Sequence, residues 1–169
     1  MKQYDVIIVG LGPTGGTLAN LLALSGFSIL ILEREKNLYA LPRAVHFDDE
    51  IMRVFQTIGI TKKFLKNTII NKGTKFVNSD GKVLLDWPRP KLITENGWYP
   101  SYRFHQPDLE KNLRNQLKNY KKVKLMQNTE VIKIKNNKNS VNLLFKSKNK
   151  LKKVRSKYVI GCDGARSTT

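Results

Sequence analysis

The first part of the chain alternates between short apolar runs and glycine-rich breaks. Val6–Val9 is β-branched and apolar at every position, which is typical of a strand buried on both faces. Residues 18–25 follow helical spacing, and Gly26 stands where a helix commonly ends. Ile29–Leu32 predicts a second buried strand that ends at Glu33. The pattern therefore predicts a strand, a turn, a helix and a strand.

The same stretch, residues 6–32, carries no charged side chain and follows Lys2. Its length would suit a membrane-spanning helix, and a positive start before an apolar run also resembles a signal peptide. Its glycines and proline argue against both, because each needs a continuous apolar run. These residues are Gly10, Gly12, Pro13, Gly15 and Gly16. We therefore expect no membrane span.

Two further helices follow from apolar spacing. The first covers residues 51–58, and the acidic residues 48–50 precede it, where negative charge complements the helix dipole. We interpret these acids as capping residues rather than catalytic ones. Pro107 suits the first turn of the second helix. Its apolar face consists of Leu109, Leu113 and Leu117.

Residues 121–157 predict an antiparallel meander. Ile132 and Ile134 alternate with Lys133 and Lys135, as in a half-buried strand. The expected strands are Val123–Met126, Val131–Ile134, Val141–Phe145 and Val154–Ile160. The fold class is therefore expected to be α/β, with a Rossmann-like βαβ unit in a parallel sheet and an antiparallel meander.

The charge is unevenly distributed along the chain. The formal net charge is +18, but residues 111–157 carry 16 basic side chains and one acidic one, Glu130. Lysines attract phosphate without specificity, and this segment has few arginines and no run of stacking aromatic residues. We expect a solvated face and no specific nucleic-acid partner. A basic nucleic-acid-binding module remains the less favoured alternative.

Cysteine and histidine content limits the other chemistry. Cys162 is the one cysteine of the sequence, so a disulfide framework and a cysteine-rich metal site are excluded. The two histidines, His46 and His105, cannot form a zinc site without carboxylate ligands. We therefore expect no metal site. We also interpret Cys162 as a small buried hydrophobic residue rather than a nucleophile.

The turn after the first strand carries the pattern Gly10-x-Gly12-x-x-Gly15. After a strand, before a helix and with an acid at the end of the next strand, this is the dinucleotide-binding fingerprint. The first glycine permits a tight turn, the second lets the backbone approach a pyrophosphate, and the third lets the helix pack closely on the strand. Pro13 and Thr14 lie inside the motif, at the start of the helix.

Glu33 ends the second strand, where it can accept hydrogen bonds from an adenosine ribose. Its charge would repel a 2′-phosphate, which argues against NADP at this site. The phosphates would lie at the helix N-terminus, where unpaired N–H groups favour an anion. The fingerprint does not separate NAD from FAD, since both contain ADP.

Four segments together resemble the flavoprotein aromatic hydroxylases, the para-hydroxybenzoate hydroxylase class of FAD-dependent monooxygenases. Within this class the chain is most similar to the 3-(3-hydroxyphenyl)propionate hydroxylase type. The segments are Gly10–Gly15 with Glu33-Arg34, Leu41–Val45 with Asp48–Glu50, His105–Pro107 with Glu110 and Leu113, and Cys162–Ser167. These segments are distributed along the whole chain, in the order in which they occur in the family.

The resemblance implies bound FAD, NADH or NADPH as electron donor, O₂, and a small phenolic substrate. It places Arg43 along the flavin, Gln106 on the flavin's ribityl or ring region, and Asp163 at the FAD ribose, with Arg166 and Ser167 holding the last turn. The expected cofactor-binding residues are Gly10, Gly12, Pro13, Thr14, Gly15, Glu33, Arg34, Arg43, Ala44, Gln106, Asp163 and Gly164. We identify no catalytic acid or base, and the oligomeric state stays open.

Members of the resembled family are much longer than this chain. We therefore expect residues 1–169 to be the N-terminal portion of the FAD-binding domain, without the second flavin motif and the substrate-binding domain. We also expect a cytoplasmic protein that does not hydroxylate a substrate with these residues alone. An FAD-dependent dehydrogenase or isoprenoid reductase, which shares the fingerprint, remains an alternative.

Overall fold

The computed structural model describes residues 3–169, except the side chain of Arg166, and divides into two compact units. The first unit contains residues 3–40 and 110–169, and the second contains Leu41–Leu109. No helix within the described residues is both long and apolar enough to span a membrane.

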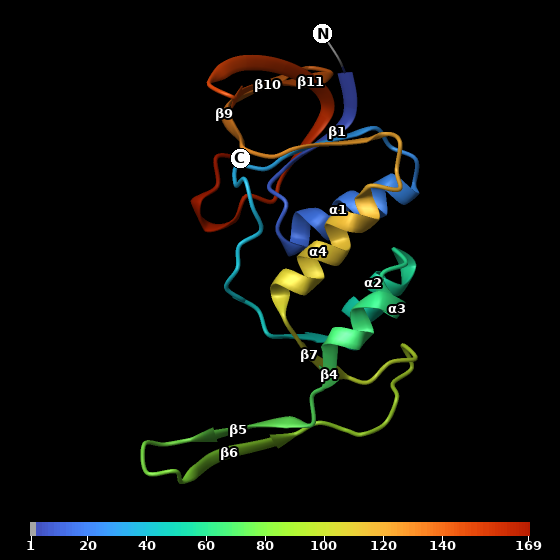
Figure 1. The fold of residues 1–169 in the computed structure, drawn as a ribbon, viewed down its shortest axis with the longest axis vertical. Helices are drawn as coiled ribbons and strands as arrows, with labels where there is room; N and C mark the ends of the chain where they lie inside the picture. Colours follow the sequence, from blue (N-terminus) through green and yellow to red (C-terminus); the bar gives the residue numbers. More distant parts are fainter. Residues whose placement is uncertain (1–2) are drawn as a thin grey trace. The chain divides into compact units, whose positions relative to one another are not determined.

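The first unit is built on a six-stranded sheet of mixed direction (Figure 1). Its order is β8 (Val123–Met126), β2 (Ile29–Leu32), β1 (Gln3–Val9), β11 (Lys150–Gly161), β10 (Ser140–Ser147) and β9 (Thr129–Asn137). The pairs from β8 to β11 are parallel, whereas β11, β10 and β9 pair antiparallel. The predicted α/β class with a parallel sheet and an antiparallel meander is confirmed.

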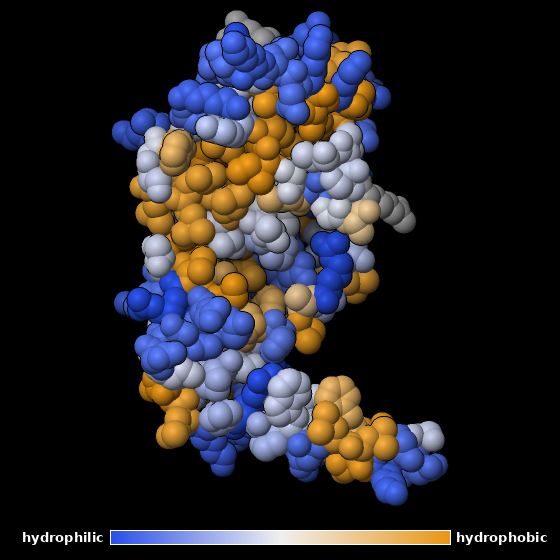
Figure 2. Space-filling view, turned by 180° about the vertical axis from the view of Figure 1, so that it is seen from behind, coloured by the Kyte–Doolittle hydropathy of each residue, from blue (hydrophilic) through white to orange (hydrophobic). Residues whose placement is uncertain are grey.

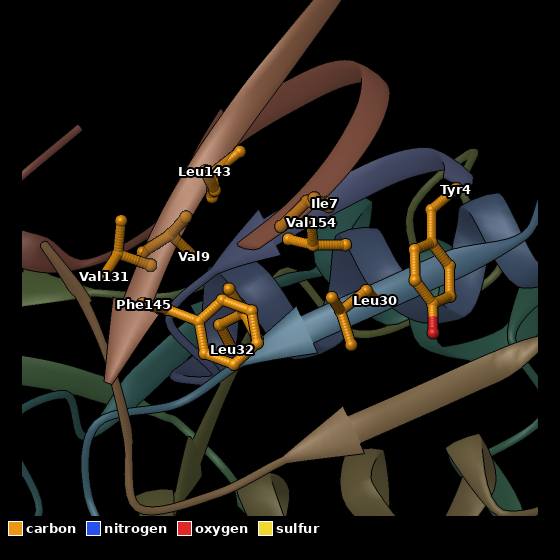
Figure 3. Close-up of a cluster of buried hydrophobic side chains, with 9 residues drawn as sticks. All are labelled: Tyr4, Ile7, Val9, Leu30, Leu32, Val131, Leu143, Phe145 and Val154. Carbon is orange, nitrogen blue, oxygen red and sulfur yellow. The ribbon is translucent and has the colours of Figure 1, made fainter. Parts of the chain in front are cut away.

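Strands β1 and β2 are buried on both faces, as their uniform apolar character predicts. Ile7 and Leu30 face the meander, where they pack with Phe145 and Val154 (Figure 3). The alternate side chains, which include Ile8, pack on the opposite face with α1 (Pro13–Leu24) and α4 (Gln106–Leu117). Each fully buried aliphatic side chain of this kind contributes on the order of 2 kcal/mol.

Helix α1 packs closely on the part of α4 that belongs to the first unit (Figure 1). A Cβ at Gly16 would lie 3.2 Å from the Leu113 side chain. The fully buried Asn20 donates hydrogen bonds from Nδ2 to the carbonyl oxygens of Gly16 and Leu113, at 2.8 and 3.1 Å. The glycine therefore allows a close approach that the asparagine then fixes.

The prediction that Val123–Met126 belongs to the meander is wrong. This strand, β8, lies at the opposite edge of the sheet and pairs parallel with β2, with Ile29 opposite Val123. A parallel neighbour needs a crossover connection, usually a helix, and α4 directly precedes β8. The meander consists of β9, β10 and β11 alone.

The expected burial of Ile132 is also wrong, since its side chain is 45% exposed. Leu144 pairs with Lys133, but the next residue, Phe145, pairs with Val131, so Ile132 is an extra residue in β9. Such a β-bulge shifts the alternation of inward and outward side chains. Consequently Val131 and Ile134 face the core on either side of the bulge.

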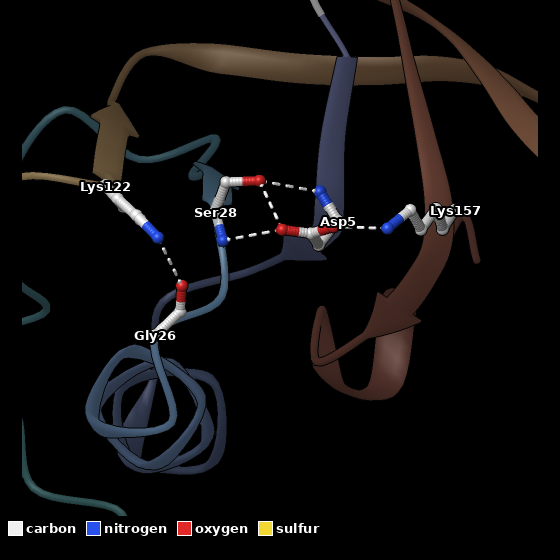
Figure 4. Close-up of polar contacts among 5 residues, drawn as sticks. All are labelled: Asp5, Gly26, Ser28, Lys122 and Lys157. Carbon is white, nitrogen blue, oxygen red and sulfur yellow. Dashed lines mark hydrogen bonds and ion pairs between the residues drawn. The ribbon is translucent and has the colours of Figure 1, made fainter.

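A polar node ties the start of β1 to the residue before β2 and to β11 (Figure 4). The Asp5 carboxylate accepts hydrogen bonds from Ser28 N and Oγ, at 2.9 and 2.6 Å, and from Lys157 Nζ at 2.8 Å. Nearby, Lys122 Nζ donates to the carbonyl oxygen of Gly26 at 3.1 Å. The bonds from Lys157 and Ser28 hold the pKa of Asp5 well below its usual range.

Replacing Asp5 by asparagine is expected to reduce the acid sensitivity of folding. The native pKa is depressed, so the carboxylate stabilises the fold above its unfolded pKa of about 3.9, and this contribution is lost as the pH falls toward the native pKa. Urea unfolding followed by circular dichroism near pH 6 and pH 3 measures the difference. An equal loss of stability in wild type and Asp5→Asn would contradict this assignment.

The second unit surrounds a cluster of aromatic side chains. Its strands are β3 (His46–Asp48), β4 (Thr68–Ile70), β5 (Gly73–Val77), β6 (Val83–Pro88) and β7 (Ser101–Phe104), and its short helices are α2 (Asp49–Thr57), α3 (Thr61–Phe64) and η1 (Leu65–Asn67). Phe47 lies at the centre, with its ring centroid 5.4 Å from those of Phe55 and Tyr102. The predicted helix over 51–58 is confirmed as α2, and Asp48 caps it by accepting from Ile51 N at 3.0 Å.

Strands β5 and β6 form a separate two-stranded hairpin. Apolar side chains are exposed along both strands, and Figure 2 shows an orange patch there. They are Phe76, Val77, Val83, Leu84, Leu85 and Trp87. The Arg89 guanidinium lies 4.4 Å from the Trp87 ring centroid, so a cation–π contact covers part of the indole.

Candidate cofactor-binding site

The loop between β1 and α1 has the tight turn and close packing expected of its outer glycines. Gly10 has φ +96°, and a Cβ on it would collide with the carbonyl oxygen of Cys162. A Cβ on Gly15 would collide with the carbonyl oxygen of Gly10. Gly10 is itself held by a 2.8 Å hydrogen bond from its N–H to the carbonyl oxygen of Leu32. The loop is therefore fixed by backbone contacts on three sides.

Gly12 differs from the other two glycines, because a Cβ on it would meet no atom within 4 Å. It is the N-cap of α1 and, being glycine, makes no side-chain capping hydrogen bond. Pro13 occupies the first turn, Thr14 is exposed, and the first turn contains no acidic residue. The first N–H groups of a helix lack partners within the helix. Open space beside uncapped donors fits the phosphates of a dinucleotide.

Glu33 is buried at the end of β2 and fixes the loop from the opposite side. Its Oε2 accepts from Leu11 N at 2.6 Å, and its Oε1 accepts from Glu35 N at 2.7 Å. A carboxylate has about four acceptor positions, so binding to a ribose hydroxyl stays compatible with these bonds. Arg34 is exposed and pairs with Glu35 at 3.3 Å, a surface contact of little energetic weight.

Asp163 organises the turn that follows β11. Its carboxylate accepts from Ser167 Oγ at 2.8 Å and from the N–H groups of Thr168 and Thr169 at 2.6 and 3.2 Å. Partial burial raises the pKa of Asp163, but these hydrogen bonds outweigh it, so the pKa lies below its usual value. Gly164 follows with φ +74°. The structure thus shows a turn-forming role, and the contact with the FAD ribose stays a prediction.

Three residues close to Asp163 in the chain were also assigned roles from the sequence. The expected help from Ser167 in holding the turn is confirmed, whereas the side chain of Arg166 lies outside the described residues. Cys162 packs at the edge of the helix-side core. Burial, together with the charge of Asp163, raises the pKa of its thiol, which agrees with an unreactive role.

In the second unit, Gln106 is buried and holds the segment that contains Arg43 and Ala44. Its Oε1 accepts hydrogen bonds from Arg43 N at 2.9 Å and from Ala44 N at 2.8 Å. The side chains of both residues remain exposed. The structure therefore brings these three predicted residues together and shows that the glutamine shapes the loop. Their contacts with the flavin stay predictions.

The sequence interpretation missed Arg114, which contacts the glycine-containing loop. Its Nη2 donates to the carbonyl oxygen of Leu11 at 3.3 Å and lies 3.6 Å from Glu110 Oε2. An available signal was the i,i+4 spacing of Glu110 and Arg114 beside the apolar face of the predicted helix. The partner across 103 residues had no such signal.

Comparison with known proteins shows the family to which the chain belongs. The family model described as FAD binding domain matches residues 3–169. The Rhodococcus jostii protein named "Probable NADH-specific resorcinol 4-hydroxylase" is 39% identical over 168 residues, covering 96% of this chain and 31% of that protein. The 3-(3-hydroxy-phenyl)propionate/3-hydroxycinnamic acid hydroxylase of Mycolicibacterium smegmatis is 34% identical, covering 98% of this chain and 29% of its own length.

Solved structures show the same fold. The p-nitrophenol 4-monooxygenase of Pseudomonas putida DLL-E4 superposes with a TM-score of 0.91 at 22% identity, covering 99% of this chain and 43% of that chain. The anhydrotetracycline hydroxylase of Streptomyces rimosus gives a TM-score of 0.83 at 25% identity, covering 99% and 33%. The chain thus spans about 30% of the length of the two curated relatives above. With a glycine-containing loop that fits a dinucleotide, it belongs to the FAD binding domain family.

Proposed function

We propose that the chain is the FAD-holding part of a flavoprotein monooxygenase that uses NADH and O₂ to hydroxylate a meta-substituted phenol. The observation that carries this proposal is the 39% identity to the Rhodococcus jostii relative, whose name specifies NADH and resorcinol. The Mycolicibacterium smegmatis relative is named for substrates that also carry a ring hydroxyl meta to a second substituent. The common chemical class is therefore an electron-rich phenol.

Residues of the two units have separate tasks in this proposal. FAD, when bound, supplies the redox chemistry that amino-acid side chains lack. The uncapped N-terminus of α1 beside Gly12 offers N–H donors to its pyrophosphate. Glu33 offers acceptor positions to the adenosine ribose, and Gln106 fixes the Arg43–Ala44 segment proposed to lie along the flavin.

The proposed reaction is balanced by the two co-substrates. NADH, a proton, O₂ and the phenol yield NAD⁺, water and a ring with one additional hydroxyl group. A dehydrogenase or an isoprenoid reductase that shares the fingerprint would not insert oxygen. Incorporation of oxygen from O₂ into the product therefore distinguishes the proposed monooxygenase from both of these flavoenzyme classes. The cytoplasmic location stays a prediction.

The experiment uses protein expressed from the whole coding sequence, reconstituted with FAD. We expect resorcinol or 3-(3-hydroxyphenyl)propionate to stimulate NADH oxidation, and mass spectrometry with ¹⁸O₂ to find one labelled oxygen atom in the product. Benzoate, which lacks the ring hydroxyl, serves as the control substrate. Oxidation of NADH without label in any phenolic product would contradict the proposal. Binding of DNA in place of FAD would favour the basic-module alternative.

A further inference from the structure

Leu11 stands in the middle of the glycine-containing loop, and side chains from two separate elements hold both of its backbone polar groups. Glu33, at the end of β2, accepts from its N–H at 2.6 Å. Arg114, on α4, donates to its carbonyl oxygen at 3.3 Å. The Leu11 side chain is 1% exposed and belongs to the helix-side core. The residue before Gly12 is therefore fixed at its amide, its carbonyl and its side chain.

Arg114 is itself well placed for this contact. Its side chain is 13% exposed and its guanidinium lies 3.6 Å from the buried carboxylate of Glu110, one helical turn earlier. Its Nε has no hydrogen-bond partner among the side chains and backbone that the structure describes, and the contacts of Nη2 with Leu11 and Glu110 orient the guanidinium. Only a guanidinium offers several donors in a fixed planar arrangement, so lysine is not an equivalent replacement.

The part of α4 that carries Arg114 is anchored directly to α1. Asn20 bonds to the carbonyl oxygen of Leu113, the neighbour of Arg114, and Gly16 packs against the Leu113 side chain. Arg114 also lines a cavity of about 540 Å³ with Lys111 and Lys118. A change at Lys118 therefore alters the charge of the cavity without touching Leu11. It serves as a control, because loss of Arg114 removes both a cavity charge and the hydrogen bond to Leu11.

We propose that Arg114 is a positioning residue for FAD: by holding the Leu11 carbonyl it keeps the Gly12 backbone in the geometry that receives the pyrophosphate. The inference rests on the proposed FAD site at the N-terminus of α1. It assigns Arg114 no contact with the cofactor. Preorganisation of a binding loop raises affinity because less ordering remains to be done on binding.

The experiment compares Glu110→Gln with the double variant Glu110→Gln/Arg114→Met in the 169-residue chain. The pair avoids leaving a buried carboxylate without its guanidinium, which alone could prevent folding. FAD affinity is measured by flavin fluorescence at a temperature where urea titrations show both proteins to be folded. We expect about tenfold weaker binding in the double variant, the loss corresponding to one hydrogen bond from a charged donor. Lys118→Met should bind FAD like wild type.

Amide hydrogen exchange without FAD provides the second measurement. Residues 10–15 should exchange faster in the double variant than in Glu110→Gln, whereas strand β10 should be unchanged. Equal exchange in the loop, or equal FAD affinity of the two folded variants, would overturn the inference. If wild type binds no FAD, the proposed function fails, and the exchange measurement still decides whether Arg114 positions the loop. Faster exchange throughout both proteins would indicate a general structural role and also overturn it.

Discussion

Replacing Gly15 by alanine is expected to lower the free energy of unfolding by about 2 kcal/mol. Alanine is favoured over glycine inside a helix by about 1 kcal/mol, so intrinsic propensity predicts the opposite sign. Packing should win because the new Cβ would collide with the carbonyl oxygen of Gly10. That oxygen cannot move freely, since Gly10 is bonded to Leu32 and lies against Cys162. Overpacking of this kind usually costs about 1–3 kcal/mol.

The matched control is Gly12→Ala in the same loop. A Cβ there meets no atom within 4 Å, and its backbone has φ −73° and ψ −169°, which any residue adopts. Because Gly12 is the N-cap, where glycine is preferred over alanine, we expect a loss of no more than about 1 kcal/mol. Urea unfolding of the three proteins without FAD measures both effects. A Gly15→Ala protein as stable as Gly12→Ala would show that the helix does not pack on the loop as described.

The βαβ unit was predictable because its information is local. β1 and β2 are uniformly apolar, which is the pattern of strands buried on both faces, and α1 starts at a proline and ends before Gly26. The glycine pattern then located the loop, and each glycine has a distinct steric surrounding in the structure. Pattern and contacts agree where neighbours in sequence are also neighbours in the fold.

Predictions failed where distant contacts decide the structure. The alternation of apolar residues in β9 is interrupted at Ile132 by a bulge that depends on the register of β10. The position of β8 depends on the crossover through α4 rather than on its own residues. Strands β5 and β6 expose most of their side chains, so they lack the periodicity that marks a half-buried strand.

The residues of the candidate site divide in the same way, into those with a local sequence signal and those whose role depends on contacts distant in the sequence. Gly10, Gly12, Gly15 and Glu33 lie in one βαβ unit and were found from spacing. The two bonds from Gln106 to the Arg43–Ala44 segment span more than 60 residues and emerged only from the structure. The sequence indicated that Gln106 was a polar residue at the start of a helix, but not that its carbonyl oxygen holds a loop. Arg114 was missed for the same reason.

Replacing Gly12 by valine tests the central claim most directly. The claim is that FAD binds with its pyrophosphate beside Gly12, at the uncapped N-terminus of α1. Because the space beside Gly12 is open and its backbone is extended, a β-branched side chain should fit the protein without FAD. The same side chain would occupy the volume that the phosphates need, and overlap of this size costs about 3 kcal/mol or roughly a hundredfold in affinity.

The measurement is a flavin-fluorescence titration of wild type and Gly12→Val with FAD, accompanied by urea unfolding of both proteins without FAD. We predict that the variant loses no more than about 1 kcal/mol of unfolding free energy, as expected for the loss of an N-cap glycine, and binds FAD at least about a hundredfold more weakly. Equal FAD affinity in the two folded proteins would contradict the account, because the cofactor's phosphates would then lie elsewhere.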